Sequence, residues 1–253
     1  MSTPDEDLPS APALTPKESA AGPPRIVPVP ATAGAVEIPP QRYIVVEGPI
    51  GVGKTSLARR LAETLEGELV LEQDAQNPFL ERFYRNPKAG ALPAQLFFLF
   101  QRAQQLGSLK QQDLFAPRRV ADYLFEKDRL FAGLTLDSAE MALYEQVASR
   151  LGVDPPRPDL VVYLQAPVET LLQRIAKRGI SYETSGIDAA YLSRLNDAYA
   201  RFFHEYDRAP LLIVNASNID PVQNQADFDE LVGAIRRMKK GRMYYNPMRH
   251  HTI

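Results

Sequence analysis

The sequence predicts an α/β fold with three layers, in which helices flank a five-stranded parallel sheet. Five short apolar runs recur along the chain, and segments of helical character separate them, as in proteins whose parallel strands are joined by crossover helices. The runs cover residues 43–46, 68–71, 119–121, 160–164 and 211–214. In such a sheet, functional residues are expected just beyond the carboxyl ends of the strands.

The helices are predicted from apolar spacing and from their end signals. Leucines four residues apart over 56–65 predict a helix directly after the first strand. The longest helix is expected over 94–106, after Pro93, with Gly107 as its end. A helical region over 134–151 follows the third strand, and later helices are expected over 168–178, 189–206 and 228–239.

The folded part is predicted to be one domain over residues 41–240, because about 200 residues suffice for one core. Residues 1–40 hold ten of the 22 prolines and seven alanines, without helical or strand periodicity. Such a segment buries too little apolar surface to offset chain entropy, so we expect a disordered extension. Residues 241–253 form a basic, tyrosine-bearing C-terminal tail for which the pattern gives no interpretation.

Composition excludes several kinds of function. The net charge is −2, so no basic field indicates a nucleic-acid polymer as partner. Cysteine is absent, which removes disulfides, thiolate metal sites and thiol nucleophiles. No apolar run approaches the ~20 residues that span a bilayer. We therefore expect a cytoplasmic protein that binds neither membranes nor nucleic-acid polymers.

The most informative stretch is Gly-Pro-Ile-Gly-Val-Gly-Lys-Thr at 48–55, which fits the phosphate-binding loop pattern G-x-x-x-x-G-K-[ST]. It lies between a predicted strand and a predicted helix, as in the P-loop NTPase fold. Backbone N–H groups of such a loop surround phosphate oxygens, and the helix N-terminus adds positive potential. Lys54 is expected to reach the β- and γ-phosphates, and the Thr55 hydroxyl to bind Mg²⁺. The nucleotide-binding residues expected here are Gly48, Gly51, Val52, Gly53, Lys54, Thr55 and Ser56.

Further polar residues are placed where a phosphoryl-transfer site needs them. Glu47, Glu72 and Asp122 follow the first three strands. Gln95 and Arg102 are seven residues apart, so they project within about 20° of one another on a mostly apolar helix. This spacing predicts a polar pocket wall or, equally well, two surface residues whose stems lie on apolar surface.

Basic residues also end the helix predicted over 168–178, namely Arg174, Lys177 and Arg178. They either complement the helix dipole or form a lid over the transferred phosphate, and spacing leaves both readings open.

Together these stretches resemble the deoxynucleoside kinase family over residues 42–237. The resemblance rests on the loop at 47–56, on Leu71-Glu72 with the segments 77–80 and 83–87, on the Gln95–Arg102 pair and on residues 158–164 and 174–178. It implies ATP-dependent 5′-phosphorylation of a deoxynucleoside, leaning toward purines, with Mg²⁺ as cofactor and a homodimer as the assembly.

The resemblance also implies roles for single residues. Glu72 resembles the general base that takes the proton from the substrate 5′-hydroxyl, and Asp122 is similar to the acid on the Mg²⁺ side. Arg174 and Arg178 occupy the place of the lid, with Arg174 on the nucleotide and Arg178 in catalysis.

The same resemblance implies a substrate pocket. Tyr84 looks like the contact to the sugar 3′-hydroxyl, and Gln95 is similar to the residue that pairs with the base edge, which Arg102 would share. Asp128 and Phe131 look like the base-reading aspartate and the ring-stacking phenylalanine. The stretch before them is about one residue short, so an ion-pair role for Asp128 and a packing role for Phe131 stay open.

The third-strand motif departs from the family pattern of an acid, an arginine and a serine. Here Asp122 is followed by Tyr123, which carries no positive charge. Lys127, Arg129 or Arg178 are the candidates to compensate, and Ile180 stands where the lid often has a second basic residue.

Two other functions are compatible with the loop. A nucleoside monophosphate kinase of the thymidylate type needs an arginine where Tyr123 stands, which disfavours it. A non-catalytic nucleotide-binding subunit would not need Lys54, Thr55 and Glu72 together.

Overall fold

The computed structural model describes residues 40–111, 118–217 and 219–247. The extension predicted for residues 1–40 therefore lies almost wholly outside the described residues, as does the end of the predicted tail from residue 248 onward. No helix in the described ranges combines the length and apolar character that crossing a bilayer requires.

The α/β fold with a parallel sheet is confirmed, but the predicted number of strands is wrong. Within the described ranges the sheet has six strands in the order β2-β3-β1-β4-β5-β6, and every neighbouring pair is parallel. The strands are β1 (Tyr43–Glu47), β2 (Glu68–Val70), β3 (Arg119–Ala121), β4 (Leu160–Gln165), β5 (Leu211–Asn215) and β6 (Arg242–Tyr245).

The sixth strand lies within the segment predicted to be a tail. Its Arg-Met-Tyr-Tyr sequence alternates exposed with half-buried side chains, because an edge strand leaves much of its surface to solvent. It therefore carries no apolar run that sequence reasoning could detect. Its pairing with β5 aligns Leu211 with Arg242 and Val214 with Tyr245.

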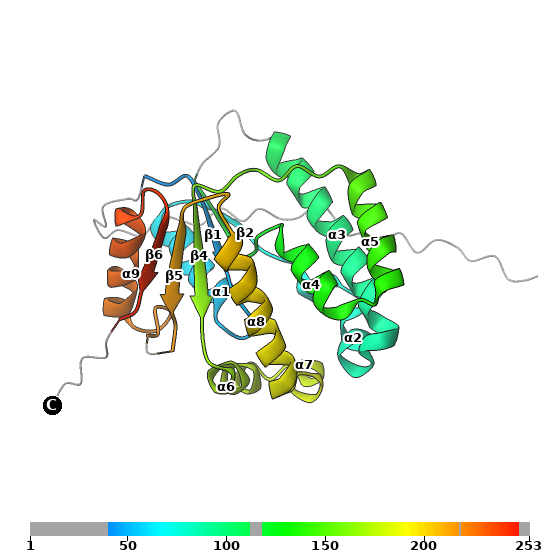
Figure 1. Cartoon of the computed structure of the whole chain (residues 1–253). Helices are drawn as coiled ribbons and strands as arrows, with labels where there is room; N and C mark the ends of the chain where they lie inside the picture. The colour runs from blue at the N-terminus through cyan, green and yellow to red at the C-terminus, as the bar shows by residue number, and fades with distance from the viewer. Residues whose placement is uncertain (1–39, 112–117, 218, 248–253) are drawn as a thin grey trace, which may run out of the picture.

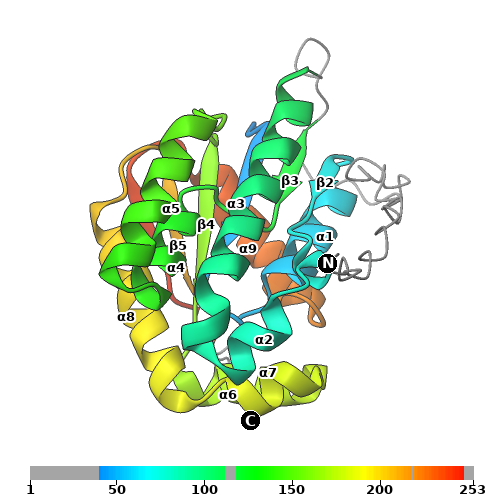
Figure 2. The same cartoon turned by 90° about the vertical axis from the view of Figure 1, so that its right-hand side faces the viewer.

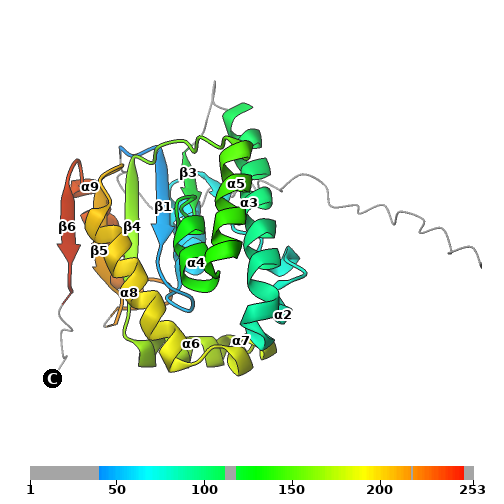
Figure 3. The same cartoon turned by 45° about the vertical axis from the view of Figure 1, so that its right-hand side comes forward.

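Helices cover both faces of the sheet, so the three-layer prediction holds. Figure 3 shows α8, α4, α5 and α3 on one side of the strands and α9 on the other, while α1 packs on β1, β2 and β3. The α-helices are α1 (Lys54–Thr64), α2 (Leu80–Arg85), α3 (Pro87–Gln111), α4 (Lys127–Thr135), α5 (Ser138–Leu151), α6 (Val168–Arg178), α7 (Ser181–Gly186), α8 (Ala189–Glu205) and α9 (Gln225–Arg237). The strand arrows point toward the end of the molecule where α6 and α7 lie (Figure 1), and α2 lies at the same end (Figure 2).

The longest helix, α3, exceeds its predicted bounds at both ends. It begins at Pro87, where the missing N–H of proline removes no helical hydrogen bond. It then continues through Pro93, which lies among buried alanines of a second apolar cluster. Gly107 does not end the helix either. Leu106 beside it is buried in the main core, and such packing outweighs the roughly 1 kcal/mol that glycine costs in a helix.

The helical region predicted over 134–151 is two helices, α4 and α5, separated at Leu136 and Asp137. Asp137 caps α5, because its Oδ1 accepts hydrogen bonds from the N–H groups of Ala139 and Glu140, both at 2.9 Å. Glu140 completes a capping box by accepting from the Asp137 N–H at 3.1 Å.

Replacing this cap should have a measurable cost. We expect Asp137→Ala to lower the free energy of unfolding by about 1 kcal/mol, because two N–H groups of α5 lose their acceptor. Urea denaturation followed by circular dichroism measures the change. Asp207→Ala, at an exposed position after α8, is the matched control, and an equal effect in both variants would contradict the capping role.

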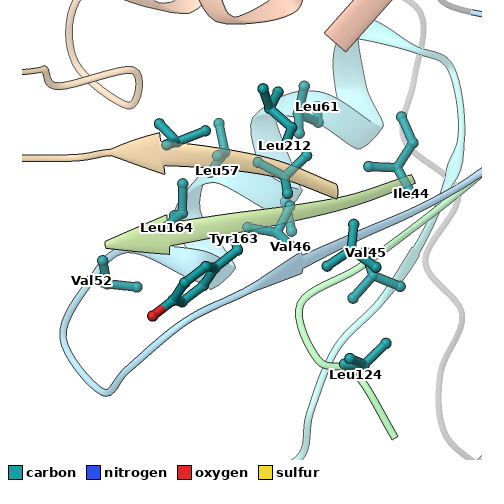
Figure 4. Close-up of a cluster of buried hydrophobic side chains, with 14 of the residues drawn as sticks. Ile44, Val45, Val46, Val52, Leu57, Leu61, Leu124, Tyr163, Leu164 and Leu212 are labelled. Atoms are coloured by element: carbon teal, nitrogen blue, oxygen red, sulfur yellow. The ribbon is translucent and has the colours of Figure 1, made fainter. Parts of the chain in front are cut away.

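The main core is formed by the sheet together with buried side chains of helices that include α1, α8 and α9. Ile44, Val45 and Val46 of β1 are buried although successive side chains point to opposite faces, which is expected of a central parallel strand covered by helices on both sides. Figure 4 shows this cluster, with Leu57 and Leu61 of α1 against the strands. This packing fixes the loop between β1 and α1 at the carboxyl edge of the sheet.

Candidate active site

The loop of residues 48–53 joins the centre of the sheet to the start of α1. Gly48 and Gly53 have φ of 151° and 104°, values that favour glycine. A Cβ on Gly48 would also lie 2.5 Å from the carbonyl oxygen of Leu164, so this glycine lets the loop pack on β4. The Lys54 Nζ donates to the carbonyl oxygens of Gly48 and Pro49, at 2.8 and 3.1 Å. The loop thus surrounds an ammonium group and the first N–H groups of α1, which is a phosphate-binding arrangement.

Two cavities meet at this loop. One, of about 230 Å³, extends toward α2, α3 and α4, and the other, of about 580 Å³, extends toward α6 and the chain after β5. Both are lined by Gly51, Lys54, Thr55 and Arg178. We call them the inner cavity and the outer cavity. A phosphate chain entering through the outer cavity would therefore end at the mouth of the inner one.

All the predicted nucleotide-binding residues except Gly48 line the outer cavity. Those that line the outer cavity are Gly51, Val52, Gly53, Lys54, Thr55, Ser56 and Arg174. Arg174 also joins two segments, because its guanidinium donates to the carbonyl oxygens of Val52 and Ala216 at 2.9 and 3.0 Å.

The residues predicted to bind Mg²⁺ are in direct contact. The Thr55 hydroxyl donates to Asp122 Oδ2 at 2.5 Å, and Asp122 Oδ1 accepts from the N–H of Glu72 at 2.7 Å. Burial raises the pKa of Asp122. Among the described residues no group of three or more histidine, cysteine or acidic side chains forms a metal cage. One hydroxyl and one carboxylate fit Mg²⁺, which keeps waters and takes its other ligands from nucleotide phosphates.

This arrangement predicts how Mg²⁺ dependence responds to substitution. We expect Asp122→Asn to raise the Mg²⁺ concentration for half-maximal activity by about tenfold or more, because a neutral amide attracts the cation less strongly. Titration of MgCl₂ at saturating ATP measures it. Asp159→Asn, which affects a carboxylate bound to the N–H groups of Arg42 and Tyr43, should leave the Mg²⁺ dependence unchanged, and a normal dependence in Asp122→Asn would contradict the assignment.

Three charged residues in the wall of the inner cavity form a cluster with Asp128, which lies behind that wall. Glu72 Oε1 pairs with Arg102 and Glu72 Oε2 lies 2.6 Å from the Nζ of Lys127. Arg102 also pairs with Asp128, and both of these side chains are buried. Two acids and two bases thus balance one another, and the Glu72 carboxylate is fixed between two cations.

Other predicted substrate residues line the same cavity. Tyr84, Gln95, Arg102 and Phe131 contribute to its wall. Gln95 and Arg102 are buried, so the reading of this pair as surface residues is wrong. The Gln95 Nε2 donates to the Thr135 hydroxyl at 3.3 Å, which orients its amide. Asp128 lies behind the wall and contacts Arg102.

The three candidates to replace the missing third-strand arginine are in different environments. Arg129 is exposed and pairs with Glu145 at 2.8 Å, Arg178 pairs with Glu183, and Lys127 alone among the three contacts Glu72. Tyr123 is buried and donates its hydroxyl to Gln105 at 2.7 Å.

Sequence reasoning missed Glu183. It is buried, lines the inner cavity and pairs with Arg178, and burial raises its pKa. The short helix α7 that carries it has no apolar periodicity to reveal it. The acid five residues after Arg178 was the available signal.

The phosphate loop opens on the outer cavity, and the half-buried carboxylate of Glu72 lines the inner cavity, which shares Lys54 with the outer one. A phosphoryl donor and its acceptor can therefore occupy separate cavities that meet at this loop. This geometry defines a P-loop kinase. The family model described as deoxynucleoside kinase matches residues 44–239, and the chain belongs to that family.

Individual relatives agree with this assignment. The chain is 32% identical to the deoxyguanosine kinase of Bacillus subtilis over 201 residues, which cover 78% of this chain and 97% of that protein. It is 30% identical to the deoxyadenosine kinase of Lactobacillus acidophilus over 194 residues, or 72% and 88% of the two chains. The solved structure of deoxyadenosine kinase from M. mycoides with dCMP and dCDP bound aligns with a TM-score of 0.66 at 25% identity, covering 76% of this chain and 97% of that one.

Proposed function

We propose that this protein transfers the γ-phosphoryl group of ATP to the 5′-hydroxyl of a deoxynucleoside, with purine deoxynucleosides preferred. The observation that carries the proposal is the junction of the two cavities at Lys54, with Glu72 in the wall of the inner one. A donor phosphate and an acceptor alcohol can meet there.

The residues of the junction have distinct roles in the proposed transfer. The acceptor oxygen forms its bond to the γ-phosphorus while the bond from that phosphorus to the β–γ bridging oxygen breaks, and its electron pair leaves with ADP. Glu72 accepts the proton of the hydroxyl. Lys54 and Arg178 face the transferred group from both cavities and neutralise its charge. Mg²⁺, when bound by Thr55 and Asp122, would neutralise further phosphate charge.

The inner cavity also supports the choice of acceptor. Gln95 offers an amide with a donor and an acceptor, the Arg102–Asp128 pair lies beside it, and Phe131 supplies a ring at the wall. Tyr84 and Glu183 line the same cavity and suit the sugar hydroxyls. The purine preference rests on the relatives named deoxyguanosine and deoxyadenosine kinase.

One screen tests the proposal. ADP release is measured with ATP, Mg²⁺ and each common deoxynucleoside, ribonucleoside and nucleoside monophosphate. We expect turnover with deoxyadenosine or deoxyguanosine. Turnover with monophosphates alone would favour the thymidylate-type kinase, and ATP binding without any turnover would favour the non-catalytic subunit. The thymidylate-type reading does not suit the inner cavity, because Arg102 and Lys127, which could hold an acceptor phosphate, are already paired with Glu72.

We further propose a homodimer in the cytoplasm. Phe100 of α3 and Leu143 of α5 are 51% and 46% exposed, and these helices lie side by side (Figure 2), so they offer an apolar face to a second copy. Sedimentation equilibrium should give twice the chain mass for the wild type. The Phe100→Glu/Leu143→Glu variant should sediment as a monomer, and a monomeric wild type would contradict the proposal.

A further inference from the structure

Lys127 is a buried cation in the wall of the inner cavity. Its side chain is only 3% exposed, and buried lysines are rare unless they are paired. Its position at the start of α4 adds a second cost, because the N-terminus of a helix disfavours positive charge. Burial, as the largest cause, and the charge of Arg102 lower the pKa of Lys127 to about 8, against the opposing effect of Glu47 and Asp122. The contacts of Lys127 must therefore offset the free-energy cost of burying its charge.

The direct partner of Lys127 is Glu72. The Nζ lies 2.6 Å from Glu72 Oε2 and 3.9 Å from Glu47 Oε1. Glu47 already accepts hydrogen bonds from the N–H groups of Gly48 and Leu124 and from the hydroxyl of Tyr199, at 2.9, 2.6 and 2.9 Å. Glu47 therefore has its hydrogen bonds without Lys127, whereas Lys127 is the one hydrogen-bond donor to Glu72 Oε2 among the described residues.

Arg102 fixes the other oxygen of Glu72. With one cation on each oxygen, the plane of the carboxylate is determined. Each oxygen still has a lone pair for an incoming hydroxyl. Arg102 alone would leave Oε2 free to turn away from the cavity.

We propose that Lys127 is a positioning residue of the phosphoryl transfer, which holds Glu72 in its reactive orientation and supplies the positive charge that the end of β3 lacks. This inference rests on the proposed function. When the acceptor hydroxyl attacks, its proton passes to Glu72, which becomes neutral. The Glu72–Lys127 pair then changes from no net charge to +1 while negative charge develops on the transferred group, so the field of Lys127 acts in the transition state.

The absence of cysteine in the natural chain allows a precise test. Lys127→Cys introduces a single thiol. Alkylation of the unfolded variant with 2-bromoethylamine gives a side chain nearly identical to lysine, and iodoacetamide gives a neutral one of similar length. Both products and the wild type, treated identically, are refolded. For each, kcat, the KM for deoxynucleoside and the Kd for ATP are measured.

We expect the neutral product to lose at least about 100-fold in kcat, the size of effect that a misplaced catalytic group causes, with ATP affinity within about threefold of the wild type. The aminoethylated product should have a kcat at least tenfold higher than that of the neutral product. When Glu72→Gln is combined with the neutral side chain at position 127, kcat should lie less than threefold below that of Glu72→Gln alone, because the carboxylate that Lys127 positions is already absent. Arg129→Met, at the exposed neighbour on the same helix, should keep wild-type kcat.

Four outcomes would overturn the proposal. The neutral product keeps kcat within threefold of the wild type, it fails to refold, or it loses ATP affinity in step with kcat. In the fourth, it lowers kcat as strongly in the Glu72→Gln background as in the wild-type background. A wild type that phosphorylates no deoxynucleoside would instead overturn the proposed function, and this inference with it.

Discussion

Glu72→Gln is expected to lower kcat for deoxynucleoside phosphorylation by a hundredfold or more while ATP still binds normally. The reason is that the amide cannot accept the proton of the attacking hydroxyl, and general bases contribute about 10²–10⁴-fold to such reactions. Glutamine is the informative replacement because it keeps the shape of a side chain held by Arg102 and Lys127. Steady-state kinetics give kcat, and calorimetric titration gives the Kd for ATP.

The measurement needs a control for a lost carboxylate elsewhere. Glu81→Gln removes an exposed acid that pairs with Arg85 on α2 at 2.7 Å and should keep wild-type kinetics. If Glu72→Gln turned over at a third of the wild-type rate or faster, Glu72 would not be the base.

Arg102→Met should lower the free energy of unfolding by about 3–5 kcal/mol, the usual cost of leaving a buried charge without its partner. Arg102 contacts both Glu72 and Asp128. Glu72 keeps Lys127, but no hydrogen-bond donor of the described residues otherwise reaches the carboxylate of Asp128. Denaturant unfolding measures the loss.

The double variant Arg102→Met/Asp128→Asn separates the lost ion pair from the orphaned charge. It should recover more than half of the loss, because its buried amide carries no charge. Arg129→Met breaks an exposed pair of the same kind, with side chains 77% and 48% exposed, and should cost less than about 1 kcal/mol. If Arg102→Met and Arg129→Met lowered the free energy of unfolding by the same amount, burial would not make the ion pairs of Arg102 more important for stability than the exposed pair of Arg129.

Sequence reasoning located the parts of the site that depend on local order. The loop over 48–55 and the acids after β2 and β3 follow from residues that are neighbours in the chain. Five of the six strands in the described residues were predicted with bounds correct to within one residue. The Gln95–Arg102 stripe was also visible, because a helix fixes the relative direction of residues seven apart. Its burial was not visible, since that depends on what packs against the helix.

The fold class, the phosphate loop and the residue types at the strand ends could thus be predicted from the order of residues, because they follow from spacing along the chain. The packing of the folded chain was needed to show that β6 joins the sheet, that Glu183 meets Arg178 and that Lys127, rather than Arg129, meets Glu72. The partners of Lys127 and Arg102 lie 55 and 30 residues away along the chain. Such pairs form only when separate helices pack at one edge of the sheet, and no local pattern encodes that packing.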